Sequence, residues 1–143
     1  MSSAGPLGWL ELRASAELRA AGILARLVDL ALEGLAIESS VRHDVSLAVA
    51  ELVANVHEHE YAGEDGGVLV RVRRAAAGLE LEVESQGPPY DLQAVLEASA
   101  ADDRLLELES GGLGLRLVVA YFDRVEGVRD GQTNRTRLIK SLP

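Results

Sequence analysis

The chain has 143 residues, of which 48% are hydrophobic and 26% are charged, as is typical of one soluble globular domain. A net charge of −9 excludes a general nucleic-acid-binding role, since phosphate backbones bind basic surfaces, and the lack of cysteine excludes disulfides, thiol catalysis and cysteine-ligated zinc. No apolar run reaches the ~18 residues of a membrane span and no signal peptide is evident, so we expect a cytoplasmic protein that does not bind membranes.

The N-terminal half is predicted to form a strand and two helices. A short apolar stretch at residues 7–13 favours an opening strand, and residues 17–35 favour an amphipathic helix rich in Ala and Leu. Ser39 or Ser40 is predicted to cap a second helix that runs to about His59. The apolar positions that suggest the first helix are Leu18, Ile23, Leu27, Leu30 and Leu35.

The second predicted helix carries a line of polar residues. Glu51, Asn55 and His59 follow one another at four-residue spacing, and at ~100° per residue they fall within an arc of roughly 80°. An Asn inside a helix is unfavourable, because its side chain competes with the backbone for hydrogen bonds. Glu51 and Asn55 are either a general base and a magnesium ligand one turn apart, or solvated residues on a helix surface. The neighbouring apolar stripe, expected in the core, consists of Val45, Val49, Leu52 and Val56.

The C-terminal half is predicted to hold a hairpin, a short helix capped by Asp91, a loop at about residues 98–112, a further helix and two terminal strands. The ranges are 68–73 and 79–84 for the hairpin, 91–97 and 113–122 for the helices, and 124–129 and 136–141 for the last strands. This order favours a single α+β domain over residues 1–143. It would be a two-layer α/β sandwich with helices on one face of a mixed, mostly antiparallel sheet.

Two glycine-rich segments are candidates for ligand contact. Gly111-Gly112-Leu113-Gly114 opens the predicted helix, where free backbone N–H groups can bind phosphate, although glycines before a helix are also common turn residues. Gly87-Pro88-Pro89 follows a predicted strand and could wall the pocket of a flat ligand or form an ordinary stiff turn. Neither segment alone identifies a ligand.

The order of these motifs resembles the Bergerat-fold (GHKL) ATP-binding family. The shared features are the helix with Glu51, Asn55, His59 and Tyr61, two strands, the Gly-Pro-Pro loop and the Gly-Gly-Leu-Gly helix start. Within this family the compact chain is most similar to the anti-sigma-factor serine/threonine kinases of partner-switching pathways. The resemblance implies a kinase that binds ATP and Mg²⁺, phosphorylates a STAS-type antagonist and sequesters a sigma factor or similar target. It also implies a homodimer formed through the first strand and helix.

The resemblance implies a role for each candidate residue. Asn55 would coordinate Mg²⁺, and Glu51 would act as general base on the substrate hydroxyl. Gly87 would shape the adenine pocket with Thr136 at its back, and the glycines of residues 111–114 would line the phosphates and hinge a lid over residues 98–112. The predicted nucleotide-binding residues are Asn55, His59, Ser85, Gly87, Pro89, Gly111, Gly112, Leu113, Gly114 and Thr136.

Two positions depart from the family pattern. Arg135 stands where the family tends to have Gly, and Ser85 stands where it has an Asp whose carboxylate accepts a hydrogen bond from the adenine amino group. A hydroxyl is a weaker acceptor by roughly 1 kcal/mol or more, and Glu84 should point to the other side of the strand. The alternative function is therefore a partner-binding module on the same fold that binds nucleotide weakly or not at all. If ATP binds, Ser85→Asp is expected to tighten it.

Overall fold

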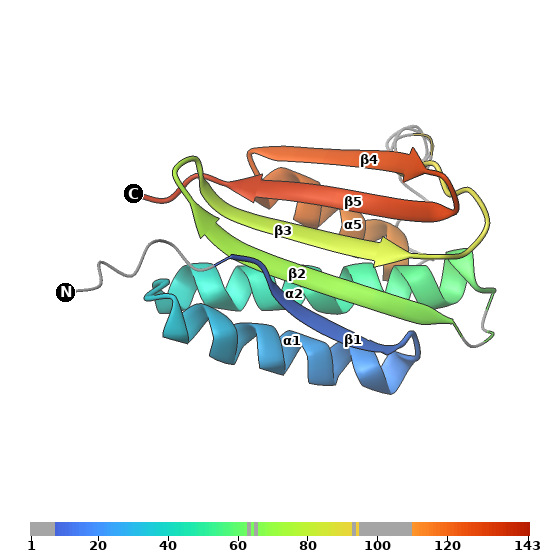
Figure 1. Cartoon of the computed structure of the whole chain (residues 1–143), viewed down its shortest axis with the longest axis horizontal. Coiled ribbons are helices and arrows are strands. Elements are labelled where there is room, and N and C mark those ends of the chain that lie inside the picture. Colours follow the sequence, from blue (N-terminus) through green and yellow to red (C-terminus); the bar gives the residue numbers. More distant parts are fainter. Residues whose placement is uncertain (1–7, 63, 65, 93, 95–109) are drawn as a thin grey trace.

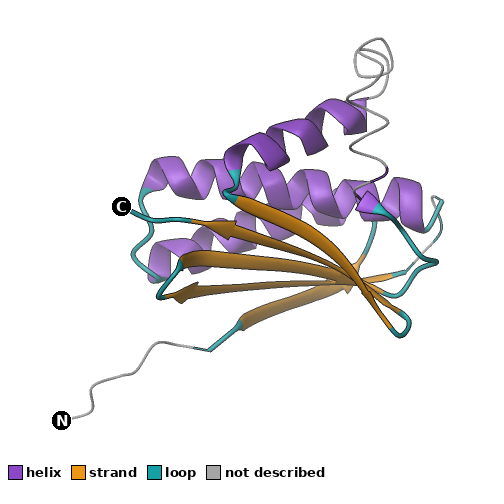
Figure 2. Ribbon diagram, turned by 90° about the horizontal axis from the view of Figure 1, so that it is seen from above, coloured by secondary structure: helices purple, strands orange, loops and turns teal. Residues whose placement is uncertain are grey.

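The computed structural model describes residues 8–62, 64, 66–92, 94 and 110–143. It is an α+β sandwich in which helices cover one face of a five-stranded sheet (Figure 1), and the view from above separates the two layers (Figure 2). The predicted fold class is confirmed. The strands are β1 (Leu10–Ser15), β2 (Gly67–Ala75), β3 (Gly78–Ser85), β4 (Arg124–Asp130) and β5 (Thr133–Lys140), and the helices are α1 (Leu18–Gly34), α2 (Ser39–Asn55), the π-helical turn η1 (Val56–Glu60) and α5 (Ser110–Tyr121).

The sheet has the strand order β1-β2-β3-β5-β4. The prediction of a mixed sheet allowed for a parallel pair, but each neighbouring pair in this sheet is antiparallel. Helix α2 contacts both α1 and α5 and lies between them over the sheet (Figure 1). This arrangement places the C-terminal end of α2 above the ends of β3 and β5.

The core lies between the sheet and the three long helices. In β3, alternation turns Leu79, Leu81 and Val83 toward the helices, as expected for a strand with one buried face. The apolar stripe predicted on α2 is confirmed, because each of its members is at most 7% exposed. That stripe is Val45, Val49, Leu52 and Val56.

The buried face of α1 differs from the predicted one. Leu24, Val28 and Leu32 point into the core, together with the small residues Ala21 and Ala25. The helix has apolar residues on most of its circumference, so periodicity alone does not decide which side is buried. Four of the apolar positions used to predict the helix are instead exposed: Leu18, Ile23, Leu27 and Leu30.

Several element boundaries also differ from the predictions. Strand β1 begins at Leu10, and β5 begins at Thr133 instead of residue 136. Helix α2 is capped by neither serine, because Glu38 is its N-cap and makes no side-chain cap bond. Asp91 does accept the predicted capping bond, 3.0 Å from the Ala94 amide. Most of the predicted lid, residues 98–109, lies outside the described residues. None of the described helices is long and apolar enough to cross a membrane.

Opposite charges cover the face of the sheet that points away from the helices. One row runs directly across the five strands in register, and neighbouring members lie 3.2 to 3.9 Å apart. Its central member, Glu82, is only 5% exposed, beneath the surrounding arginines. The row consists of Glu11, Arg71, Glu82, Arg137 and Glu126.

Gly78, at the start of β3, is predicted to be intolerant of any side chain. Its φ is +129°, and an added Cβ would overlap the backbone carbonyl oxygen of Lys140 in β5. We expect Gly78→Ala to lower the free energy of unfolding by roughly 1–3 kcal/mol, measured by chemical denaturation. Gly131→Asn is the control, because Gly131 has φ +60° and no atom within 4 Å of an added Cβ, and Asn tolerates that conformation. Equal losses for the two variants would contradict this account.

Candidate functional site

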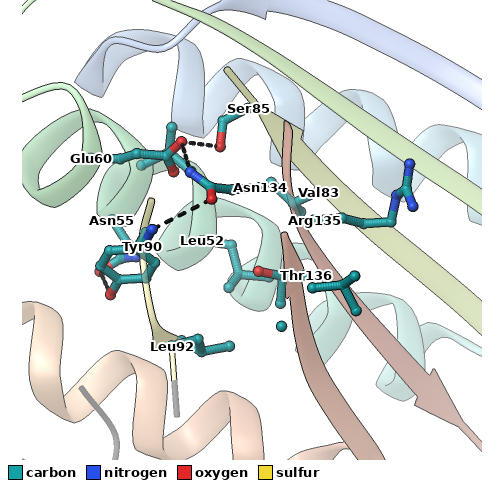
Figure 3. Close-up of a pocket in the computed structure, with 13 residues that line it drawn as sticks. Leu52, Asn55, Glu60, Val83, Ser85, Tyr90, Leu92, Asn134, Arg135 and Thr136 are labelled. Carbon is teal, nitrogen blue, oxygen red and sulfur yellow. Dashed lines mark hydrogen bonds between the residues drawn. The ribbon is translucent and has the colours of Figure 1, made fainter. Parts of the chain in front are cut away.

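A small cavity lies where the C-terminal end of α2 meets the ends of β3 and β5 (Figure 3). Its volume is about 20 Å³, which is room for about one water molecule. Three predicted site residues, Asn55, Ser85 and Thr136, line this cavity. It is also lined by Arg135 and by three polar residues that the sequence did not single out: Glu60, Tyr90 and Asn134.

Glu60 is the centre of the polar contacts around the cavity. Its side chain is only 4% exposed. One carboxylate oxygen, Oε1, accepts hydrogen bonds from Ser85 Oγ at 2.5 Å and Asn134 Nδ2 at 2.6 Å (Figure 3). The same oxygen accepts from the Gly87 amide at 3.1 Å. A side chain at Gly87 would collide with this acid, because an added Cβ would lie 2.6 Å from Glu60 Cγ. Gly87 thus contacts the site through its backbone, with Glu60 packed against it.

The π-helical turn η1 determines that Glu60, and not His59, faces the cavity. The Tyr61 amide donates to the Val56 carbonyl, an i to i−5 bond that puts an additional residue into the last turn. The position one turn beyond Asn55 is therefore taken by Glu60. His59, predicted on one face with Glu51 and Asn55, instead has a side chain that is 45% exposed, with Glu58 4.0 Å away.

Asn134 connects Glu60 to the loop after β3. Its amide nitrogen donates to Glu60 and to the Pro88 carbonyl at 2.8 Å, and its Oδ1 accepts from Arg129 at 3.0 Å. Arg129 also donates to the Gly87 carbonyl at 2.8 Å. Alternation along β5, which turns Asn134, Thr136 and Leu138 toward the helices, is the sequence signal that could have identified Asn134 as a site residue.

The predicted metal ligand, Asn55, is buried, and its side-chain oxygen accepts a hydrogen bond from a tyrosine. Asn55 is 6% exposed, and its Oδ1 accepts a hydrogen bond from the Tyr90 hydroxyl at 3.2 Å. Burial raises the pKa of Tyr90, and the nearby charge of Glu60 raises it further. Tyr90 therefore stays protonated at neutral pH and remains a donor to Asn55.

Ser85 and Arg135, the two residues that depart from the family pattern, point to opposite faces of the sheet. Ser85 points toward the cavity and contacts Glu60, whereas the Arg135 side chain points away from the cavity (Figure 3). Arg135 donates to Glu84 at 2.7 Å on the other face of the sheet. The prediction that Glu84 points away from Ser85 is thereby confirmed. The side chain of Arg135 does not narrow the cavity.

Glu51, the predicted general base, lies one turn before Asn55 but faces α5. It lines a groove of about 530 Å³ between α2 and α5, together with Leu47, Leu117 and Gly114. An added Cβ at Gly114 would overlap the Glu51 carboxylate, so the absence of a side chain there leaves the space that this carboxylate occupies. Burial, and secondly the charge of Glu58, raise the pKa of Glu51 above its usual 4.5. A raised pKa makes this carboxylate a stronger base.

The remaining predicted site residues lie at the edge of the cavity or in the first turn of α5. Pro89 is beside Tyr90 at the edge of the cavity and lines an adjacent surface depression. Gly111, Gly112 and Leu113 lie within the first turn of α5, because this helix begins at Ser110, earlier than the predicted start at residue 113.

Residues 12–140 match the family model described as the histidine kinase-like ATPase domain. The chain belongs to this family. It is also similar to the serine-protein kinase RsbW of Halalkalibacterium halodurans, with 33% identity over 91 residues. That alignment covers 61% of this chain and 55% of the relative, so the chain matches about half of the relative's length.

Membership of the histidine kinase-like ATPase family implies ATP binding, and the residues at the cavity have suitable chemistry. Asn55 offers a hard amide oxygen of the kind Mg²⁺ prefers, and one or two protein ligands are enough when phosphates and water complete the octahedron. The available space is the obstacle, because about 20 Å³ is far below the ~300–1,000 Å³ of small-molecule sites. A nucleotide can enter only if the cavity widens, and release of the Tyr90–Asn55 contact would also free the amide oxygen.

Proposed function

We propose that the protein is an ATP- and Mg²⁺-dependent serine/threonine protein kinase that acts on a regulatory partner. Its substrate would be a STAS-type antagonist, and it would sequester a sigma factor or similar target when that antagonist is phosphorylated. The observation that carries the proposal is the placement of Glu51 and Asn55, which lie one turn apart on α2. Glu51 lines the open groove and Asn55 lines the cavity. Family membership and the likeness to a serine-protein kinase support it.

The two residues would have different tasks in phosphoryl transfer. Asn55 would hold the magnesium ion, and bound magnesium supplies positive charge that neutralises the phosphate oxygens. Glu51 would accept the proton of the substrate hydroxyl as its oxygen attacks the terminal phosphorus, while ADP leaves. The groove between α2 and α5 is lined by apolar side chains beside Glu51 and would receive a segment of the partner protein next to that hydroxyl.

Phosphate transfer tests the kinase proposal directly. The purified chain would be incubated with terminally radiolabelled ATP, Mg²⁺ and STAS-domain proteins captured from the native cell. We expect labelling of a serine or threonine in one of them, and loss of labelling with Asn55→Ala. A chain that binds these partners but labels none of them would contradict the kinase activity.

A second candidate function is a partner-binding module that uses the same fold without efficient nucleotide binding. Two observations favour it: the cavity has room for only about one water molecule, and residue 85 lacks a carboxylate. Calorimetry with Mg-ATP and Mg-ADP separates the two candidates. The module predicts no saturable heat at millimolar nucleotide, whereas the kinase predicts saturation.

The exposed apolar residues of α1 support a homodimer. Ile23, Leu27 and Leu30 recur at helical spacing on its outer side and are 54%, 42% and 62% exposed. We expect a dimer in solution that Ile23→Glu with Leu30→Glu converts to a monomer, because two charges would be buried without partners. Light scattering after gel filtration measures the mass. Leu117→Glu is the control, since Leu117 is 64% exposed on α5, and it should leave the dimer intact. A monomeric native chain would contradict the homodimer.

A further inference from the structure

Glu60 is a buried acid whose hydrogen-bonding capacity is only half used. Three donors converge on Oε1, from Ser85, Gly87 and Asn134. Among the residues that the structure describes, none donates to the second oxygen, Oε2, and none forms an ion pair with Glu60. Burial of a carboxylate is unfavourable unless its lone pairs find donors. Oε2 is not among the buried side-chain atoms of the described residues that lack a partner, so it is accessible at the cavity, where a ligand could bring an N–H or O–H group.

The position of Glu60 relates this free acceptor to the proposed nucleotide site. Glu60 lines the same cavity as Asn55 and Thr136 (Figure 3). It lies in hydrogen-bond contact with Ser85, the residue that stands where the resemblance implies an acidic acceptor for adenine. A carboxylate is thus present 2.5 Å from Ser85 Oγ, supplied by η1 instead of β3.

We propose that Glu60 recognises the nucleobase by accepting a hydrogen bond from the exocyclic amino group of adenine. Ser85 is then a positioning residue, which donates to Oε1 and leaves Oε2 for the ligand. This inference rests on the proposed nucleotide-binding function. It also reverses the expected effect of Ser85→Asp, because that change would set two carboxylates against each other where Ser85 and Glu60 are now 2.5 Å apart.

The Glu60 carboxylate would make the site selective for nucleobases that carry an exocyclic amino group at the position where adenine has one. Hypoxanthine carries a carbonyl oxygen where adenine carries its amino group, so inosine nucleotides would present an acceptor to an acceptor. A site built around a hydrogen bond rejects the analogue that lacks the matching group. We therefore expect the native protein to bind ADP more tightly than IDP.

Calorimetry of the full chain with Mg-ADP and Mg-IDP tests the role of Glu60 without turnover. Glu60→Gln keeps the shape and an oxygen for the three donors but replaces the charged acceptor. We expect it to weaken ADP binding by roughly 10- to 100-fold and to bring the ADP to IDP affinity ratio close to one. Glu58→Gln is the matched control, because Glu58 is an exposed acid in the same turn, and it should leave the ratio unchanged.

Moving the carboxylate provides a second, independent readout. Ser85→Asp alone should weaken ADP binding, and Ser85→Asp combined with Glu60→Gln should recover at least roughly 10-fold of that affinity, because a single carboxylate is restored to the site. Circular dichroism verifies folding. If Glu60→Gln fails to fold, Glu60→Asp replaces it in the test. Aspartate keeps the negative charge, so this variant should still bind ADP more tightly than IDP.

The outcomes separate failure of this inference from failure of the proposed function. A native protein that binds ADP, with a ratio unaffected by Glu60→Gln or with tighter binding in that variant, would overturn the inference alone. Tighter binding by Ser85→Asp alone would also overturn it, because the acceptor would then belong on residue 85. No saturable heat with either nucleotide in the native protein would reject the nucleotide-binding function and this inference together.

Discussion

Glu51→Gln is expected to lower the rate of phosphate transfer to the partner by roughly 10²- to 10⁴-fold, the usual contribution of a general base. Glutamine keeps the size of the side chain but cannot accept the hydroxyl proton. Nucleotide affinity should stay within about threefold, because Glu51 lines the groove beside α5 and not the cavity. Single-turnover labelling measures the rate, and calorimetry measures the affinity. Native rates in the variant would exclude Glu51 as the base.

The pH dependence of the same reaction provides a separate check on Glu51. Burial and the charge of Glu58 raise its pKa above 4.5, and a general base must be deprotonated to act. The rate should therefore fall, as the pH is lowered, at a higher pH than for an ordinary glutamate. This acidic limb should be absent from the residual activity of Glu51→Gln. An acidic limb that persists in that variant would assign the titration to another group.

Gly114→Ala is expected to separate stability from activity. Alanine stabilises a helix interior by up to about 1 kcal/mol relative to glycine, so the melting temperature should be unchanged or higher. The new Cβ would overlap the Glu51 carboxylate, which can rotate away because it is the end of a flexible side chain. A base displaced by about 1 Å can lose roughly 10²-fold in rate, and we expect a loss of that order in the labelling assay.

Gly22→Ala is the matched control for Gly114→Ala. Gly22 lies in α1, and a Cβ there would have no atom within 4 Å. It should produce the same gain in helix stability with no change in the rate of labelling. If both glycine variants were fully active, close contact between α5 and Glu51 would have no role in catalysis.

Much of the fold could be predicted from the sequence because alternation and helical periodicity are local. The stripe of Val45, Val49, Leu52 and Val56 is buried as predicted, and the hairpin of β2 and β3 forms where alternation indicated. The buried face of α1 was predicted wrongly, because an Ala- and Leu-rich helix offers apolar residues in most directions. Its burial is decided by tertiary packing, in which α1 contacts α2 and β1.

The candidate site was predictable only in part, and the π turn is the physical reason. Asn55, Ser85 and Thr136 meet at one cavity, as the order of motifs indicated. Regular helical spacing placed His59 beside Asn55, and the i to i−5 bond at Tyr61 brings Glu60 there instead. Nothing in the local sequence marks that additional residue in the turn. The position of Glu60 at the cavity could therefore be recognised only from the structure.

The charges on the outer face of the sheet determine which strands can be neighbours. The three inner strands carry one sign each on that face: arginines on β2 and β5, and glutamates on β3 between them. Pairing β2 with β5 would set arginine against arginine, and like charges directly opposite each other destabilise a sheet. The outward charges thus favour the pairing of β3 with β5 over the pairing of β2 with β5. Charges on the outer face of the sheet thereby help to hold Ser85 opposite Asn134 on β5.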